Sequence, residues 1–316
     1  MIQSTPATNN RTRYLMASIY TLAPMHCGTG QTAGAVDLPI AREAHTGLPV
    51  LPATSIKGVA RDEVERQDRD GKDTKWFFGP DTSDQSALSA GALLFTEGRL
   101  IAYPMRSLNQ PFLYVTCPLI LERLKRDLRA FGREDSLGDW SVPRFQERQA
   151  YVVDPLLAGK TLVLEDLVYT RNEVTQLRGL ETLAEGLSLL LPENETDTRE
   201  RLKRLLVVLP DDDFQDAISR VVPVRARIKL GEGKTTGGSG DDSGNLWYEE
   251  SLPSDCLFVT FVGERRRRFG GPAGSQGGSG DTLELFQHIY APELQLVQMG
   301  GNETVGYGLC WWTFAG

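Results

Sequence analysis

Residues 22–61 read LAPMHCGTGQTAGAVDLPIAREAHTGLPVLPATSIKGVAR. The stretch begins after residues 13–22, whose alternating pattern predicts a β-strand. It holds a glycine loop that carries His26, a lone Asp37 and an Arg-Glu-x-His cluster. It ends at a Ser-x-Lys-Gly sequence that predicts a helix over residues 55–70, with Thr54 or Ser55 as its N-cap. Because the N-terminus of a helix offers free backbone N–H groups, and Lys57 lies in its first turn, the stretch predicts a polyanion site.

The rest of the chain alternates between predicted strands and helices and includes antiparallel hairpins, a mixture typical of the α+β class. Apolar stretches bounded by turn residues predict strands at 92–95, 100–103, 112–116, 151–154, 161–169, 256–262 and 309–314. Residues 221–230 and 246–250 predict the two strands of a long hairpin. Helical periodicity predicts helices over 118–131 and 282–298 and an acidic helical stretch over 177–218.

The composition is that of an ordinary globular protein of one or two domains. The chain has 316 residues, 40% of them hydrophobic, and 34 Lys and Arg against 42 Asp and Glu, a net charge of −8. That balance argues against binding nucleic acid through bulk positive charge. The acidity is uneven, however, because residues 155–220 hold 13 acidic and 8 basic side chains, a net charge of −5. A local groove for an anion therefore remains possible in the N-terminal part.

Several other classes of protein find no support in the sequence. The four cysteines are far apart, without a Cys-x-x-Cys pair, which favours reduced thiols over disulfides or structural zinc. No apolar run reaches the roughly 18 residues that a membrane span needs, and the N-terminus lacks a signal-peptide core, so we expect a cytoplasmic protein with no membrane partner. The motifs of dinucleotide-binding proteins, P-loop enzymes, serine hydrolases and zinc proteases are absent or broken.

Four specific motifs lie close together at Pro24-x-His26-x-Gly28-x-Gly30, Val36–Ile40, Arg42–Gly47 and Ser55–Gly58. Further motifs follow at Ala90–Phe95, Val115–Leu119, Leu246–Glu250 and Gly300–Gly308. In these motifs and in their order, the chain resembles the backbone subunit of type III-B CRISPR effector complexes, the fourth subunit of the Cmr module in the RAMP superfamily. The chain departs from the family at Ala53-Thr54, where Gly-Ser is usual, and at Gly270–Gly280, which has the composition of an inserted loop.

The resemblance implies a single RAMP domain over residues 1–316. Its palm, of RNA-recognition-motif or ferredoxin-like topology, combines N- and C-terminal segments. Residues 155–220 are then a helical acidic insertion and residues 221–250 a β-hairpin thumb. Several copies would form a filament along the CRISPR RNA, together with other Cmr subunits, and each copy would cut target RNA near its thumb. RNA would be recognised by shape and backbone, because the guide reads the sequence.

The resemblance also implies roles for particular residues. Asp37 matches the catalytic residue, which binds a divalent metal, Mg or Mn, or orients the 2′-OH that attacks the phosphate. Glu249 is a candidate for catalytic support, and His26 for either catalysis or RNA contact. The predicted RNA contacts are His26, Arg42, Ser55, Lys57, Trp247, Tyr248, Gly300, Gly301, Gly306 and Gly308.

Structural roles remain open for most of these residues. Lys57 could be solvated, Trp247 could pack in the core, and Arg42 could pair with Glu43 or with another acidic neighbour. The run Arg265–Arg268 could contact RNA or a neighbouring subunit, or lie in solvent.

Two other functions also remain open: a backbone subunit that binds the guide without cutting, and the backbone nuclease of a type III-A complex. The Val-Asp-Leu-Pro setting of Asp37 favours a nuclease, and the sequence Arg42–Gly47 favours type III-B.

Overall fold

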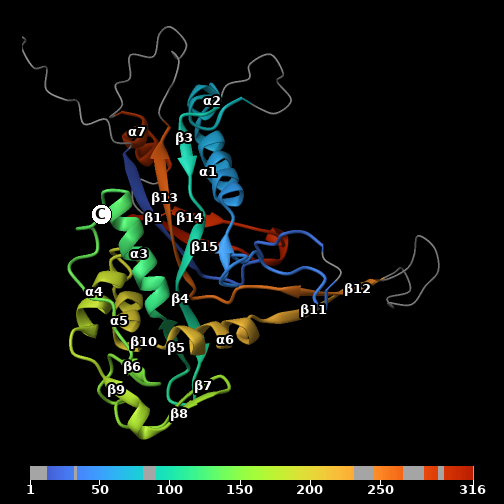
Figure 1. Cartoon of the computed structure of the whole chain (residues 1–316). Coiled ribbons are helices and arrows are strands. Elements are labelled where there is room, and N and C mark those ends of the chain that lie inside the picture. The colour runs from blue at the N-terminus through green and yellow to red at the C-terminus, as the bar shows by residue number, and fades with distance from the viewer. Residues whose placement is uncertain are drawn as a thin grey trace, which may run out of the picture.

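A large mixed sheet forms the body of the protein (Figure 1). The computed structural model describes residues 13–31, 34–80, 90–230, 245–265, 281–290 and 295–315. The sheet has the strand order β14-β15-β1-β13-β4-β5-β10-β6-β9, with β2 paired to β4 and β3 to β13. Its strands are β1 (Tyr14–Thr21), β2 (Val50–Leu51), β3 (Leu93–Phe95), β4 (Gly98–Arg106), β5 (Phe112–Thr116), β6 (Ala150–Val152), β9 (Val174–Gln176), β10 (Leu206–Val208), β13 (Leu257–Glu264), β14 (Gln295–Gln298) and β15 (Leu309–Ala315).

The centre of the sheet joins the two ends of the chain. β1 pairs antiparallel with β13 on one side and with β15 on the other. All of its residues after Tyr14 are buried, so both faces of the strand are covered. The predicted first strand is thus confirmed, and it lies between the last long strands of the sequence.

Helices pack beside this sheet along apolar stripes. α1 (Ala53–Gln67) buries Ile56, Ala60 and Val64, which recur every four residues on one face. α3 (Pro118–Ala130) starts with a proline, which suits the first helical position, and packs beside β4. The remaining helices are α2 (Lys72–Phe78), α4 (Leu180–Ser188), α5 (Thr196–Leu205), α6 (Asp211–Val221) and α7 (Asp281–Tyr290), with short 3₁₀ turns η1 (Arg171–Glu173) and η3 (Glu303–Val305). None of the described helices has the length and apolar character to span a bilayer.

A two-stranded hairpin, β11 (Val224–Lys229) and β12 (Asn245–Glu250), projects from the body (Figure 1). Directly paired residues share a face, and successive residues alternate between faces. We call one side the cationic face; it carries Arg225, Arg227, Lys229, Asn245, Trp247 and Glu249. We call the other the apolar face; it carries Val224, Ala226, Ile228, Leu246, Tyr248 and Glu250. The hairpin predicted from the sequence is therefore present, with its strands within three residues of the predicted bounds.

The α+β class is confirmed, but several predicted elements are wrong in detail. The helical stretch predicted over 177–218 is broken by β10, an apolar Leu-Val-Val run that inserts between β5 and β6. With β9 and the hairpin β7 (Leu162–Leu164) and β8 (Leu167–Tyr169), residues 155–220 form strands as well as helices. The strand predicted at 161–169 is that hairpin, which turns at Glu165 with a φ of 53°.

Two helix ends also differ from the prediction. The helix predicted over 282–298 ends at Tyr290, and residues 295–298 form the edge strand β14. The first helix begins at Ala53 after Pro52, which has no capping side chain, so the predicted N-caps Thr54 and Ser55 lie inside the helix. Lys57 is its fifth residue and therefore begins the second turn. The four cysteines are buried and unpaired, as expected for reduced thiols.

Candidate nucleic-acid interface

The base of the hairpin is bound to the segment that carries Asp37. Leu38 and Glu249 form a parallel bridge, in which the Leu38 amide donates to the Tyr248 carbonyl at 3.0 Å and the Glu250 amide donates to the Leu38 carbonyl at 2.9 Å. The segment that carries Asp37 therefore lies alongside β12, joined to it by an isolated bridge. This pairing brings together segments more than 200 positions apart in the sequence.

The Asp37 side chain is held by the same strand. Its Oδ2 atom accepts a hydrogen bond of 2.7 Å from the backbone N–H of Tyr248. The residue is half-buried. An aspartate that only shaped its own turn would bond to a nearby amide of that turn. Asp37 instead bonds to the hairpin, which fixes the carboxylate at the junction of hairpin and body.

Glu250 is the second anchor on β12. Its backbone carbonyl accepts from Nδ1 of His26 at 2.7 Å, so in the neutral ring Nδ1 carries the proton. Its carboxylate accepts from the Ile40 amide at 3.1 Å and pairs with Arg42 at 3.4 Å. Arg42 therefore pairs with Glu250 and not with Glu43. Because residues 248 and 250 are two positions apart on a strand, the anchors for Asp37 and His26 are separated by about 7 Å.

Two glycine loops meet at His26. The Gly301 amide donates to the His26 carbonyl at 2.9 Å, and a Cβ atom on Gly300, whose φ is +89°, would lie 2.3 Å from the same carbonyl oxygen. A Cβ on Gly28 would lie 2.5 Å from Nε2 of His26. Glycine is thus required at Gly300, where the backbone approaches closely, whereas a side chain at Gly28 would displace the imidazole of His26. The N-terminal and C-terminal loops form one surface around this histidine.

Gly306 and Gly308 shape the rest of the C-terminal loop. Both have positive φ, of 80° and 78°, and a Cβ on Gly308 would lie 2.1 Å from the Met299 carbonyl oxygen. The Gly308 amide donates to the Pro24 carbonyl at 2.7 Å. The loop is therefore tied to residues 24–26 at two points.

Glu249 points away from the anchors of Asp37. It is only 3% exposed, and its Oε1 atom accepts from Nδ2 of Asn302 at 2.5 Å and pairs with Arg227 at 3.4 Å. The carboxylate predicted to support Asp37 is thus engaged by the other face of the hairpin and by the C-terminal loop. The sequence analysis does not single out Asn302 and Arg227. The one sequence signal that bears on them is the alternation along β12, which puts the side chains of Glu249 and Tyr248 on opposite faces of the hairpin.

The remaining predicted contacts lie elsewhere. Ser55 and Lys57 are half-buried on α1, and the described hydrogen bonds and ion pairs do not join them to Asp37 or His26. Trp247 is half-buried on the cationic face, whereas Tyr248 is 45% exposed on the apolar face. Only Arg265 of the run Arg265–Arg268 belongs to the described residues.

The described side chains around Asp37 do not form a metal site by themselves. Within the described parts of the chain, no group of three or more His, Cys, Asp or Glu side chains lies close enough to hold a metal ion. Glu249 and Glu250, the nearest acidic residues on β12, are paired with arginines. The described side chains around Asp37 alone therefore do not supply a full set of metal ligands.

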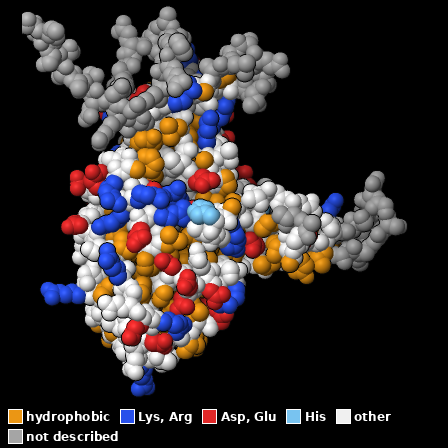
Figure 2. All heavy atoms as spheres, viewed as in Figure 1, with side chains coloured by type: hydrophobic (Ala, Val, Ile, Leu, Met, Phe, Trp, Pro, Cys, Tyr) orange, Lys and Arg blue, Asp and Glu red, His pale blue; other side chains and the backbone are white. Residues whose placement is uncertain are grey.

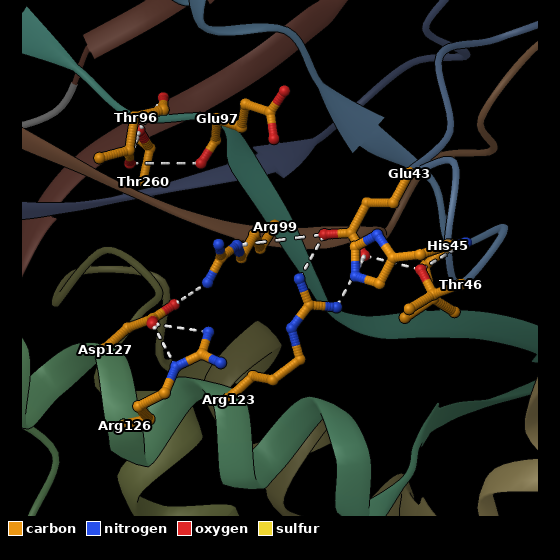
Figure 3. A network of polar contacts seen from close by, with 11 residues as sticks. Glu43, His45, Thr46, Thr96, Glu97, Arg99, Arg123, Arg126, Asp127 and Thr260 are labelled. Carbon is orange, nitrogen blue, oxygen red and sulfur yellow. Dashed lines mark hydrogen bonds and ion pairs between the residues drawn. The ribbon is translucent and has the colours of Figure 1, made fainter.

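A buried ion pair between Glu43 and Arg123 joins the loop that precedes α1 to α3 (Figure 3). The Glu43 carboxylate, 7% exposed, receives both terminal nitrogens of Arg123, at 2.7 and 2.5 Å. It also accepts the Thr46 hydroxyl at 2.6 Å, which closes the turn around it. Burial alone would raise the pKa of Glu43, but the hydrogen bonds from Arg123 and Thr46 outweigh it and hold the pKa below its usual value. The pair fixes the loop against the body.

Comparison with known proteins gives consistent matches over nearly the whole chain. The model of the RAMP superfamily matches residues 18–311. The CRISPR system Cmr endoribonuclease Cmr4 of Pyrococcus furiosus is 30% identical over 299 residues, which cover 93% of this chain and 92% of that protein.

Two solved structures show the same fold. The oligomeric Cmr4 of Pyrococcus furiosus superposes with a TM-score of 0.72 at 24% identity and covers 97% of this chain and 99% of its own. A chain of the type III-B Cmr-beta complex bound to cognate target RNA gives a TM-score of 0.70 at 20% identity, covering 95% and 96%.

Proposed function

Because the chain belongs to the RAMP superfamily, we propose that it is a backbone subunit of a type III-B CRISPR complex that holds the CRISPR RNA and cuts the paired target RNA. The relative of 30% identity is named as an endoribonuclease, and similar folds occur in an oligomer and in a complex with target RNA. The partners are then further copies of this chain, other Cmr subunits and the two RNA strands.

The proposed palm is the group of strands β15-β1-β13-β4. Their order, antiparallel pairing and chain sequence, with α1 between β1 and β4 and α7 between β13 and β15, fit the ferredoxin-like arrangement. The hairpin β11–β12 is the proposed thumb. In this assignment the Asp37 segment lies where thumb and palm join.

We assign cleavage to attack of an RNA 2′-OH on the adjacent phosphorus. The O2′–P bond forms and the P–O5′ bond breaks, which leaves a 2′,3′-cyclic phosphate and a 5′-oxygen that takes a proton from water to become a 5′-OH. Asp37 orients the 2′-OH and accepts its proton, and the Tyr248 N–H keeps the carboxylate in place. His26 and the glycine loops contact the RNA backbone, since residues without a Cβ atom allow a close approach.

A divalent metal, Mg or Mn, would be held by Asp37 together with RNA phosphate oxygens. Mg²⁺ commonly binds one or two carboxylates and substrate phosphates in this manner. When bound, it would stabilise negative charge on the scissile phosphate.

The observation that carries the proposal is the Asp37–Tyr248 hydrogen bond, which holds a carboxylate at the junction of hairpin and body. The test is Asp37→Asn in the assembled complex. We expect guide binding to remain and target cleavage to fall by at least about 100-fold. Asp139→Asn, at an exposed aspartate, is the control and should cut normally. If the complex with Asp37→Asn cuts at the wild-type rate, Asp37 is not the catalytic residue and the proposal fails.

A further inference from the structure

We propose that a cavity between α3 and the sheet binds a small carboxylate with an apolar body, whose charged end is held by Arg99. The cavity has a volume of about 100 Å³. Its walls come from β4, β13, α3 and the loop that precedes β2. Asp37, His26 and the described residues of the hairpin do not line it. The inference therefore goes beyond the proposed function and does not depend on it.

The inner wall of the cavity is apolar. The residues that β4, β13 and α3 contribute to it are each 4% exposed or less: Leu100, Val259, Phe261, Ile120 and Leu124. Beside them, Phe131 packs against Phe261 with the ring centres 4.3 Å apart. A cavity of about 150 Å³ with such a lining stays dry and binds benzene. The smaller cavity here fits a branched aliphatic group or, at most, one aromatic ring.

The entrance to the cavity is charged, and two of its acidic groups are already engaged. The Glu43 carboxylate accepts from both terminal nitrogens of Arg123 and from the Thr46 hydroxyl. The Asp127 carboxylate is shared by two arginines, one of which is Arg126, with its Nη2 atom at 3.0 Å. The entrance therefore offers few acceptors to a cationic ligand.

Arg99 is the cation of this entrance that has donors to spare. Figure 3 shows it between Asp127 and Glu43. Its Nη1 atom donates to Asp127, but its Nε atom is 4.0 Å from Oε1 of Glu43, which is too long for a hydrogen bond. The third acid of the entrance, Glu97, points its carboxylate away from Arg99 (Figure 3). The hydrogen bonds among the described residues therefore leave the Nε–Nη2 edge of Arg99 without an acceptor.

That edge of Arg99 determines the class of ligand. Two parallel N–H groups of a guanidinium match the two oxygens of a carboxylate. The Arg99 side chain is 37% exposed, so a carboxylate can reach it from solvent while the apolar body enters the cavity. A phosphate would need further donors for its remaining oxygens, and the apolar wall supplies none.

The surrounding surface also favours an anion. Figure 2 shows Lys and Arg side chains gathered over α3, where Arg126 and Arg129 are exposed and Lys125 is half-buried. Clustered cations raise the local concentration of small anions. The inferred ligand is therefore a monocarboxylate that carries one short aliphatic or aromatic group.

The first experiment is calorimetric titration of the full chain with isovalerate, benzoate and phenylacetate near physiological salt. At least one of them should bind with a Kd of about 1 mM or below, which is a reasonable affinity for so small a ligand. The neutral amide of the same acid should bind at least about tenfold more weakly, because it cannot form the charged pair. No binding of any of the acids at about 10 mM, or equal binding of acid and amide, would overturn the proposal.

Arg99→Gln tests the charged end of the site. It should weaken binding of the acid at least about tenfold and leave binding of the amide nearly unchanged. Arg126→Gln is the matched control, because it removes an equal charge and another partner of Asp127 but lies outside the cavity lining. Its affinity for the acid should stay within about twofold of wild type. An equal loss in both variants would reveal a general effect of charge and would contradict the assignment to Arg99.

Leu124→Phe tests the location of the ligand. The larger side chain occupies part of the cavity and should abolish binding of both acid and amide. The thermal midpoint of the free chain shows whether this variant folds. Val259→Ile, which adds one methyl group from the side of the sheet, is the milder second variant and should weaken binding of phenylacetate several-fold. Wild-type affinity in either variant, once it is shown to fold, would place the acid elsewhere and refute the inference.

Discussion

Glu43 shows how one side chain secures the loop that precedes α1. Its carboxylate has the Arg123 guanidinium on one side and the Thr46 hydroxyl on the other, and the Gly47 amide donates to its backbone carbonyl at 2.8 Å. The neighbouring Arg42 reaches the hairpin through Glu250. A change at Glu43 therefore affects both the stability of the turn and the support of the hairpin base.

We expect Glu43→Gln to lower the free energy of unfolding by about 3 kcal/mol at pH 7, because it leaves Arg123 buried without its partner. A carboxyl group whose pKa is lower in the folded state stabilises the protein above its unfolded pKa, near 4.3, and that contribution is lost as pH falls through the folded pKa. The variant should therefore lose less stability than wild type on acidification.

Urea titrations at pH 7 and at decreasing pH provide the measurement. Glu65→Gln, which removes one partner of an exposed pair with Arg61, is the control and should change stability by less than about 1 kcal/mol. Parallel acid profiles for Glu43→Gln and wild type would show that the ion pair does not set the pKa of this group.

At the scale of elements, the C-terminal glycine loop offers a matched pair of positions. Gly306 and Gly308 have nearly the same positive φ, but a Cβ on Gly306 would meet open space, whereas one on Gly308 would meet the Met299 backbone. Gly306→Ala should cost about 1 kcal/mol from backbone strain alone. Gly308→Ala should cost more and weaken RNA binding, because the Met299 backbone must move. The measurements are the thermal midpoint of unfolding and the RNA affinity of the two variants. Equal effects of both substitutions would mean that the close approach of Gly308 to the Met299 backbone is unimportant.

The elements also show which parts of the fold the sequence could predict. Alternation and motif order located β1, the hairpin and the Asp37 segment correctly, because these patterns are local. The strand β10 was missed because three apolar residues, Leu206–Val208, inside a helical region form a strand only when β5 and β6 are beside them. The end of α7 was missed because β14 exists only through its pairing with β15.

The grouping of the candidate site residues was predictable only in part. A local motif singles out Asp37, His26 and the glycine loops, whose roles stay predictions. The role of Glu250 was not predictable, because its contacts with His26, Ile40 and Arg42 span more than 200 positions. Alternation along β12 places it on the face opposite Glu249, but no local pattern shows which distant residues either face contacts.

For the molecule as a whole, the net charge of the chain and the local charge at the hairpin are separate properties. The chain carries −8 overall, and residues 155–220 hold −5 of it. Residues 180–205, which form α4 and α5, hold −2 and lie on the side of the body away from the hairpin, whereas α6, which leads into the hairpin, holds −3 (Figure 1). Charges in solvent are screened over about 8 Å at physiological salt. The acidity of α4 and α5 therefore has little effect at the hairpin.

Removing two exposed acids there, by Glu193→Gln with Asp197→Asn, should leave RNA affinity within about twofold of wild type near 0.15 M salt. The measurement is the same RNA titration, repeated at low salt, where a small gain in affinity is expected. A large gain at physiological salt would mean that the overall field of the protein controls RNA binding.

The position of β1 between β13 and β15 has a consequence for the order of folding. Both strands that pair with β1 follow it by more than 230 positions, and the contact of Gly301 with His26 also joins distant segments. A chain cut before β13 therefore has neither a closed central sheet nor a complete surface around His26. Such a fragment cannot take the place of the intact chain at that surface.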